Sequence, residues 1–341
     1  MKQVIYRKTG EPEVLELRDI PIPEVKKGEV LIKMLATSVN GGDLGLRRGN
    51  PKKNQKVMKQ PKVIGIDVVG VVDKLGEGVT DFKVGDMVWG NSGPNNGTTA
   101  EYYTIPAKKV SLMPEGMEPT TAAALPTVGI TAITALLDVG KLKSGENILI
   151  RGSGGVGLVA IQIAKAHGAY VTALCSGKIS DGVKELGADE VYDYRKMPID
   201  KLGKFDLIFD TAGGSLNDLR KHLTSKGRLI TVVVGDALNV LTSLIHGKHR
   251  TRLALGFSTH KKLDYLKQMT NRGEVVPVID SIYPMEQIVE AHRRAEERGI
   301  LGKIVISIAE KKIIKWWILT KYSMFVALLL RLVRSNERLH L

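Results

Sequence analysis

Three glycines, Gly152, Gly154 and Gly157, form the pattern G-x-G-x-x-G within the stretch GSGGVG. The pattern follows the apolar segment Asn147–Arg151 and precedes the apolar stretch 158–169, so it lies between an expected strand and an expected helix. Glycines let the backbone approach a pyrophosphate closely, and a helix N-terminus offers it free N–H groups. Alone, the glycines would indicate no more than a tight turn. In this context they predict a dinucleotide cofactor.

The end of the next expected strand, Tyr170–Cys175, indicates which dinucleotide is preferred. An acidic residue at this point would bond the ribose hydroxyls and repel a 2′-phosphate. The sequence has Ser176 and Lys178 there, and the first acid is Asp181. A hydroxyl and an ammonium group suit a phosphate better. We therefore expect NADPH rather than NADH, with Lys178 as a plain surface charge as the alternative.

Strands that alternate with helices must position this motif. Further apolar strands are expected at Phe205–Phe209 and Arg228–Val234, with helical segments between the strands. This alternation is typical of a Rossmann domain with a doubly wound parallel sheet, which we place at residues 121–265. The fold class is therefore α/β.

The flanking regions have a different character. Residues 1–120 show short strands, such as Val30–Met34 and Val63–Val72, separated by Gly, Asn, Asp and Pro turns. Residues 266–310 return to β-type segments with one helix in MEQIVEAHRRAEER, so we expect this segment to fold back onto the first domain. An Ala/Leu-rich helix is expected at Thr120–Asp138.

Composition limits the classes of function. A chain of 341 residues with 43% hydrophobic and 25% charged residues fits a two-domain globular protein. The single cysteine, Cys175, allows no disulfide framework and favours a reducing compartment. The N-terminus has no secretory or transit pattern, so we expect a cytoplasmic protein. The net charge is +14, but the basic run Arg47–Lys62 has no aromatic residue to stack a base, so we expect no nucleic-acid partner.

The last segment, residues 311–341, is basic and amphipathic, with seven Lys or Arg against one Glu. Its longest uncharged run, Tyr322–Leu330, has nine residues, well short of the roughly 20 that a spanning helix needs. A helix lying on an anionic membrane is one reading, which would make the protein peripheral at the membrane. Packing against the body or a partner subunit, and an atypical reading-frame end, are the others.

Many sequence blocks, in order, resemble the medium-chain dehydrogenase/reductase superfamily, within it the zinc-free quinone oxidoreductase-like branch. The blocks that carry the resemblance are SVNGGDLGLRRG (38–49), VIGIDVVGVVDKLGEGVTDFKVGDMVWG (63–90), TTAEYYTIPA (98–107), LPTVGITAITAL (125–136), SGENILIRGSGGVG (144–157), LGADEVYDYR (186–195), FDLIFDTAGG (205–214), KGRLI (226–230) and GILGKIVI (299–306). The resemblance implies a GroES-like β-rich catalytic domain beside the Rossmann domain, an active site in the cleft between them, and a homodimer.

The resemblance also assigns roles by position. Asn40 matches a residue beside the nicotinamide and is our catalytic candidate, and Thr127 matches one near the nicotinamide ribose. Ser176, Lys178 and Tyr194 match positions that hold the adenosine 2′-phosphate. The full set expected at the cofactor is Asn40, Thr127, Ser153, Gly154, Gly155, Val156, Ser176, Lys178 and Tyr194.

A catalytic zinc is not expected. Zinc sites need Cys, His or carboxylate ligands, yet no histidine precedes His167 and no cysteine precedes Cys175. Where metal-dependent relatives have GHE, this chain has Gly65-Ile66-Asp67, and Asn40 stands where they have a ligand cysteine. The site residues therefore include no metal ligands.

These features favour hydride transfer from NADPH to a small molecule, a quinone or an activated alkene or carbonyl. Asn40 or backbone N–H groups would stabilise the resulting anion, and water would protonate it. Asp43 is a candidate base, but we expect it to brace its loop. The stretch 44–51 lacks the pocket tyrosines common in the branch, which leaves quinone specificity open. An alcohol dehydrogenase-like enzyme and an NADPH-binding structural or sensor protein are the alternatives.

Overall fold

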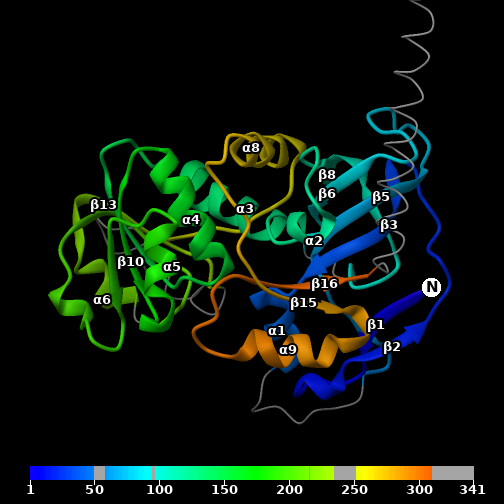
Figure 1. Cartoon of the computed structure of the whole chain (residues 1–341), viewed down its shortest axis with the longest axis horizontal. Coiled ribbons are helices and arrows are strands. Elements are labelled where there is room, and N and C mark those ends of the chain that lie inside the picture. The colour runs from blue at the N-terminus through cyan, green and yellow to red at the C-terminus, as the bar shows by residue number, and fades with distance from the viewer. Residues whose placement is uncertain (50–57, 94–96, 215, 234–250, 309–341) are drawn as a thin grey trace, which may run out of the picture.

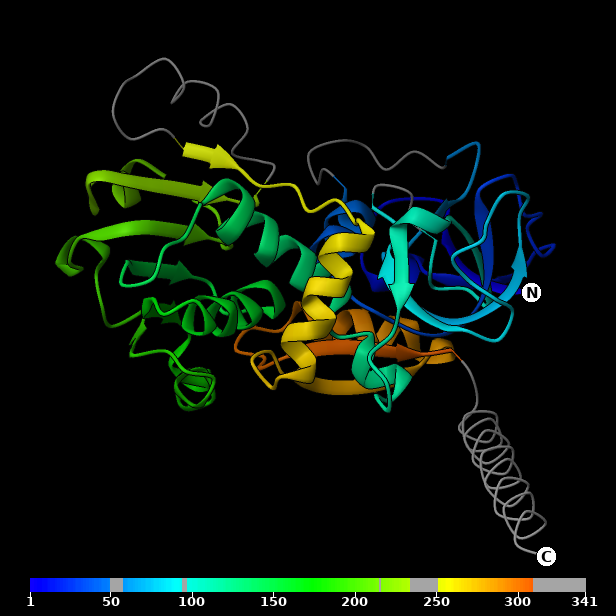
Figure 2. The same cartoon turned by 90° about the horizontal axis from the view of Figure 1, so that it is seen from above.

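The computed structural model describes residues 1–49, 58–93, 97–214, 216–233 and 251–308. The two β-rich halves of the chain lie side by side, with helices between them (Figures 1 and 2). The tail interpreted from the sequence, residues 311–341, and residues 50–57 of the basic run lie outside the described residues.

In the described residues, six strands form a parallel sheet in one half of the molecule. Its strand order is β11-β10-β9-β12-β13-β14, and every described pairing in it is parallel. This order places the first strand of the unit at the centre, as the doubly wound fold requires. The strands are β9 (Asn147–Arg151), β10 (Tyr170–Cys175), β11 (Glu190–Asp193), β12 (Phe205–Asp210), β13 (Leu223–Thr231) and β14 (Thr251–Leu253). The predicted Rossmann-type parallel sheet is confirmed.

Helices bury the faces of this sheet because their own sequences are apolar. In α4 (Gly155–Ala166), the residues from Gly157 to Ala164 are all buried. The helix packs against β9 and β10 and against α3 (Pro126–Ile133), which in turn contacts α8 (His260–Asn271). Two shorter helices of the described chain, α5 (Ser180–Glu185) and α6 (Leu216–Arg220), also belong to this unit. The glycine motif therefore opens a helix that is fixed in the core.

The other half is built on a mostly antiparallel sheet with the order β15-β16-β3-β5-β6-β8, and β7 pairs with β3. The strands are β3 (Glu29–Ser38), β5 (Asp67–Leu75), β6 (Met87–Asn91), β7 (Tyr102–Pro106), β8 (Val110–Leu112), β15 (Ile279–Pro284) and β16 (Lys303–Ser307). A small sheet of β1 (Lys2–Tyr6), β2 (Glu16–Asp19) and β4 (Lys62–Val63) lies beside it. The GroES-like, β-rich character expected of this half is confirmed.

One pairing in this sheet matters most for the site. Strand β16 runs antiparallel to the end of β3, with Val305 opposite Ser38, and the N–H of Val39 donates to the carbonyl of Ile304 at 2.9 Å. Residues about 265 positions apart in the chain thus become neighbours.

The boundaries of the four segments expected from the sequence, 1–120, 121–265, 266–310 and 311–341, stay predictions.

Two expected elements are divided in the structure. The expected strand Val63–Val72 is interrupted at Gly65, whose φ of +97° no extended residue adopts, so β4 ends before it and β5 begins after it. The expected helix Thr120–Asp138 is split into α2 (Pro119–Ala122), α3 and a π-helical turn at Thr134–Val139. Pro126 causes the first break, because it lacks an N–H donor and instead starts α3 at its first position.

The return segment contains its expected helix in shortened form. A 3₁₀ turn at Met285–Gln287 leads into α9 (Ile288–Glu296).

Within the described residues, one helical stretch, Pro119–Val139, is long and apolar enough to cross a bilayer, and 72% of its most apolar window is buried inside the protein. That burial is typical of a core helix.

Candidate functional site

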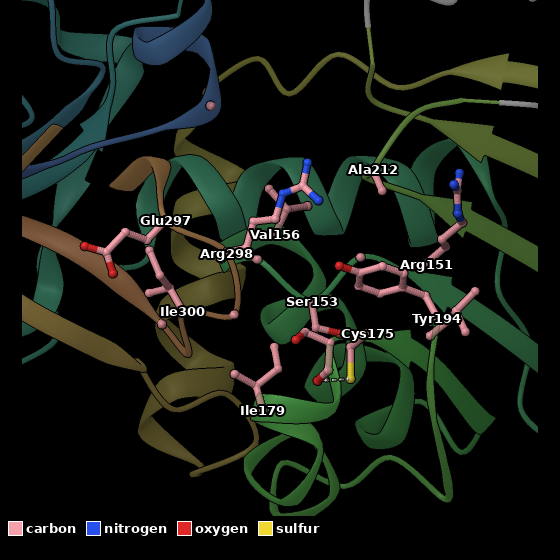
Figure 3. Close-up of a pocket in the computed structure, with 18 of the residues that line it drawn as sticks. Arg151, Ser153, Val156, Cys175, Ile179, Tyr194, Ala212, Glu297, Arg298 and Ile300 are labelled. Carbon is pink, nitrogen blue, oxygen red and sulfur yellow. Dashed lines mark hydrogen bonds between the residues drawn. The ribbon is translucent and has the colours of Figure 1, made fainter. Parts of the chain in front are cut away.

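A cleft of ≈ 990 Å³ lies between the two halves. Its walls come from the parallel sheet, from the turn after β3 and from the loop between α9 and β16. In Figure 3, Glu297, Arg298 and Ile300 enter from the return loop, while Arg151 and Tyr194 come from the opposite side. The volume is large enough for a dinucleotide and a small acceptor together.

The N-terminus of α4 opens into this cleft. Gly154 is its N-cap and provides no side-chain acceptor, so the first N–H groups of the helix are not capped. The hydroxyl of Ser153 is buried with no hydrogen-bond partner among the residues that the structure describes. A Cβ on Gly157 would lie 1.9 Å from the carbonyl oxygen of Gly152, so the turn closes only with glycine there. Uncapped donors and an orphaned hydroxyl fit a bound pyrophosphate.

The expected 2′-phosphate residues surround one end of the cleft. Ser176 and Tyr194 line it, and the Arg195 guanidinium stands 5.3 Å from the Tyr194 ring centre. Lys178 is exposed and does not line the cleft. Its side chain passes close to Gly299, since a Cβ added to that glycine would lie 3.0 Å from Lys178 Cδ. Two cations and a hydroxyl therefore gather at this end.

An acid that the sequence analysis overlooked is also close. Asp193 ends β11, and its carboxylate approaches Gly177, where a Cβ would meet it at 2.5 Å. One of its oxygens accepts a hydrogen bond from the backbone N–H of Arg195 at 3.0 Å. This contact holds the turn that presents Tyr194 and Arg195.

At the other end of the cleft, the amide of Asn40 is fully engaged. Its Nδ2 donates to the carbonyl of Ser38 at 3.1 Å and to Asp67 Oδ2 at 2.8 Å. Its Oδ1 accepts from Lys303 Nζ at 2.6 Å, and the same ammonium donates to the carbonyl of Val39 at 2.7 Å. A carboxylate on one side and an ammonium on the other fix which way the amide faces.

Asp67 is the acceptor at the centre of this network. Its Oδ2 also accepts from the hydroxyl of Ser38 at 2.6 Å, and its Oδ1 accepts from the backbone N–H of Thr127 at 2.7 Å. The hydroxyl of Thr127 in turn accepts from Asn91 Nδ2 at 2.8 Å. Thr127 does not line the cleft directly, but Asp67 ties it to Asn40.

Asp43 braces the loop, as we expected. One of its oxygens accepts from the backbone N–H of Asn40 at 2.9 Å, as part of a capping box at the start of α1 (Gly41–Arg48). The other accepts from the backbone N–H of Gly65, also at 2.9 Å. Burial raises the pKa of the Asp43 carboxyl to about 6, and the two backbone hydrogen bonds oppose that rise. Both oxygens are engaged with backbone groups.

The expected cofactor residues therefore fall into two groups. Those that line the cleft are Asn40, Ser153, Gly154, Gly155, Val156, Ser176 and Tyr194, and those that stand just behind it are Thr127 and Lys178.

Sequence reasoning missed three basic residues of the cleft. Arg151 ends β9 and donates to Asp210 Oδ1 at 3.1 Å and to the carbonyl of Gly213 at 2.6 Å. Arg298 is exposed, lines the cleft and has no hydrogen-bond partner in the described part of the chain. Lys303 is buried at the start of an apolar strand, GKIVIS, and that unusual position was the available signal.

Within the described residues, no three His, Cys, Asp or Glu side chains come together to hold a metal ion. At the positions compared with metal-dependent relatives, Asn40 and Asp67 bond each other. Burial raises the pKa of Cys175, which lies at the bottom of the cleft, to about 11, so its thiol stays protonated at neutral pH.

Comparison with known proteins agrees with this geometry. The chain matches the alcohol dehydrogenase GroES-like domain over residues 26–115 and the zinc-binding dehydrogenase family over residues 186–306. It is 35% identical to the mitochondrial NAD(P)H oxidoreductase RTN4IP1 of Mus musculus, across 89% of this chain and 88% of that one.

Solved structures show the same relationship. The quinone oxidoreductase from Coxiella burnetii superposes with a TM-score of 0.84 at 30% identity, covering 91% of this chain and 99% of that one. A mycobacterial protein solved in complex with NADPH has a TM-score of 0.75 at 27% identity, covering 90% and 100%.

Fold and cleft together define an NAD(P)H-dependent oxidoreductase. The chain belongs to the medium-chain dehydrogenase/reductase superfamily, in its quinone oxidoreductase-like branch.

Proposed function

We propose that this protein is a zinc-independent, NADPH-dependent reductase of quinones or of activated alkenes and carbonyls. One observation carries the proposal. The uncapped N-terminus of α4 lines the same cleft as Asn40 and Lys303, which Asp67 supports from behind. The N-terminus can hold a pyrophosphate, and the two side chains place polar groups where a reacting carbonyl must be polarised.

The preference for NADPH is supported by the charges at the adenosine end. Lys178 and Arg195 flank the Ser176 hydroxyl and the Tyr194 ring, whereas the nearby Asp193 carboxylate is engaged with the backbone of Arg195. A phosphate gains charge-assisted hydrogen bonds from such groups. The NADPH complex of the mycobacterial neighbour adds support from outside the chain.

Independence from zinc is supported by the network itself. Asn40 stands where metal-dependent relatives have a ligand cysteine, and Gly65-Ile66-Asp67 where they have GHE; both Asn40 and Asp67 are engaged by hydrogen bonds to protein groups. Quinones and enones are electron-poor enough to accept hydride with polarisation from fixed donors alone. When bound, the nicotinamide supplies that hydride, and the residues of the chain orient the acceptor and stabilise the charge that develops.

The test is oxidation of NADPH and NADH by the purified protein with 9,10-phenanthrenequinone, a benzoquinone and a short 2-enone. We expect turnover with at least one of these acceptors, and a much higher kcat/KM for NADPH than for NADH. Equal use of both cofactors would contradict the NADPH preference. A dialysed, chelator-treated sample serves as the control, and loss of activity there with recovery on adding zinc would contradict zinc independence.

Absence of turnover with every acceptor, together with NADPH protection against thermal unfolding, would instead favour the structural or sensor protein. Turnover of alcohols alone would favour the alcohol dehydrogenase-like enzyme. We keep a homodimer and a cytoplasmic location as expectations; sedimentation and fractionation test them. The relative RTN4IP1 is named as a mitochondrial protein.

A further inference from the structure

The buried ammonium of Lys303 has an unused donor. Lys303 is 6% exposed and lines the cleft, and an ammonium carries three N–H groups. Two of them reach the carbonyl of Val39 and Asn40 Oδ1. The described residues provide no hydrogen-bond acceptor for the third. A buried cation with an open donor position is costly unless a ligand completes it.

Asn40 cannot supply this donor without breaking the network. Both of its amide protons go to Ser38 and Asp67, and its Oδ1 is taken by Lys303. The amide therefore holds the ammonium in place. Among the side chains of this network in the described part of the chain, Lys303 is the one with an N–H left for a ligand.

The route of the side chain indicates which ligand it meets. A Cβ on Gly155 would lie 2.6 Å from Lys303 Cδ, so the lysine stem passes directly across the turn expected to hold the pyrophosphate. The ammonium continues past that turn and is anchored at Val39 and Asn40. It thus lies on the Asn40 side of the glycine turn, where the resemblance to the family implies the nicotinamide.

The surrounding charges favour a cation here. Burial lowers the pKa of the Lys303 ammonium, while the carboxylates of Asp67 and Asp43 oppose that change. Because these two carboxylates are buried and fixed by other hydrogen bonds, they favour the positive charge without occupying the third N–H.

We propose that Lys303 is a catalytic residue whose third N–H donates to the acceptor oxygen on which negative charge collects during reduction. This inference rests on the proposed function. The hydride leaves the dihydronicotinamide of NADPH with both electrons of its C–H bond and forms a C–H bond at the β-carbon of an enone. The alkene electron pair moves toward the oxygen and gives an enolate, and a proton from water completes the saturated product as NADP⁺ remains.

A quinone receives the same two electrons and becomes a hydroquinone monoanion, again protonated by water. In both cases the oxygen is neutral before the transfer and anionic after it. The hydrogen bond from an ammonium strengthens as that charge appears, so it accelerates the chemical step more than it tightens ground-state binding.

The substitution Lys303→Met tests this, with Lys303→Arg as the charge-retaining variant and Lys33→Met on β3 of the same sheet as the matched control. We expect Lys303→Met to lower kcat about 100-fold or more, in the range for loss of one oxyanion donor, and to leave NADPH affinity within about threefold. Lys303→Arg should recover part of the rate, and Lys33→Met should match the wild type. A large loss of NADPH affinity with kcat intact would overturn the proposal and assign Lys303 to the pyrophosphate.

A second measurement needs neither turnover nor a stable variant. We expect 4-nitrophenol to bind the wild-type protein as its coloured phenolate, so that its absorbance titration shifts to lower pH on binding. If the neutral phenol binds as well as the phenolate, Lys303 does not hold an anionic oxygen. If no acceptor turns over, the proposed function fails, while this titration still decides the role of Lys303.

Discussion

Asp67 Oδ2 accepts a hydrogen bond from Asn40 Nδ2 at 2.8 Å, and this contact joins β5 to the turn after β3. Three donors in all converge on the Asp67 carboxylate, which is 1% exposed. The positive charge of Lys303 lies on the far side of the Asn40 amide. The relationship makes Asp67 the structural centre of the site, although it does not line the cleft.

The substitution Asp67→Ala should therefore be strongly destabilising. It leaves the three donors from Ser38, Asn40 and Thr127 without their acceptor, and each buried donor left unsatisfied costs roughly 1–3 kcal/mol. Urea unfolding measures the change. Asp73→Ala, an exposed carboxylate on the same strand, is the control and should stay within about 0.5 kcal/mol of the wild type. Similar losses in the two variants would show that the network contributes little.

Lys178→Ala should reduce the preference for NADPH. Removing one cation beside the 2′-phosphate position should raise the KM for NADPH about tenfold, since a hydrogen bond to a charged group contributes roughly 1.5–3 kcal/mol. The KM for NADH, which lacks that phosphate, should not change. Lys184→Ala on α5 removes the same charge from an exposed position nearby and serves as the control. A parallel rise in both KM values would show that Lys178 does not contact the 2′-phosphate.

Arg298→Ala should weaken the binding of NADPH and NADH alike. Arg298 lines the same cleft as Val156 of α4, with no hydrogen-bond partner in the described part of the chain (Figure 3). An arginine there can pair with the pyrophosphate that both cofactors share. We expect about a tenfold rise in both dissociation constants by fluorescence titration. Arg293→Ala on α9, whose arginine pairs with Glu13 instead, should leave both unchanged.

His292 should make the protein less stable in acid. Burial, reinforced by Arg47, lowers the pKa of His292 to about 3 from its ordinary value of 6.5. In the unfolded chain, His292 therefore binds a proton below pH 6.5, whereas in the folded protein it binds one only below about pH 3. The folded state loses roughly 1.4 kcal/mol per pH unit within that window, or about 2 kcal/mol from pH 7.5 to pH 5.

The variant His292→Asn isolates this contribution. Its unfolding free energy should be lower than that of the wild type at pH 7.5, and the difference between the two proteins should shrink by about 2 kcal/mol at pH 5. Other groups, such as Asp43, titrate in both proteins and cancel in the comparison. A difference that does not depend on pH would mean that His292 has the same pKa in the folded and in the unfolded protein.

The sequence by itself determined the local features of this protein. Strong apolar runs bounded by glycine predicted the strands β9, β10 and β12 almost to the residue, because parallel strands buried on both faces read as nearly continuous apolar runs. The motif of Gly152, Gly154 and Gly157 likewise predicted the cofactor turn, because its chemistry is contained in a few consecutive residues. Pro126 and Gly65 divided longer runs, and both residue types were visible signals.

Only the tertiary structure decided how the catalytic end of the cleft is assembled. Lys303 reaches Asn40 because β16 pairs with β3, and no local pattern contains a contact between residues so far apart in the chain. Likewise, Asp67 entered the sequence comparison only as part of Gly65-Ile66-Asp67, the counterpart of GHE, while its role as acceptor for Asn40 and Thr127 depends on three separate segments converging. Hydrogen bonds act over about 3 Å, so their partners are set by packing, which the order of residues specifies only through the whole fold.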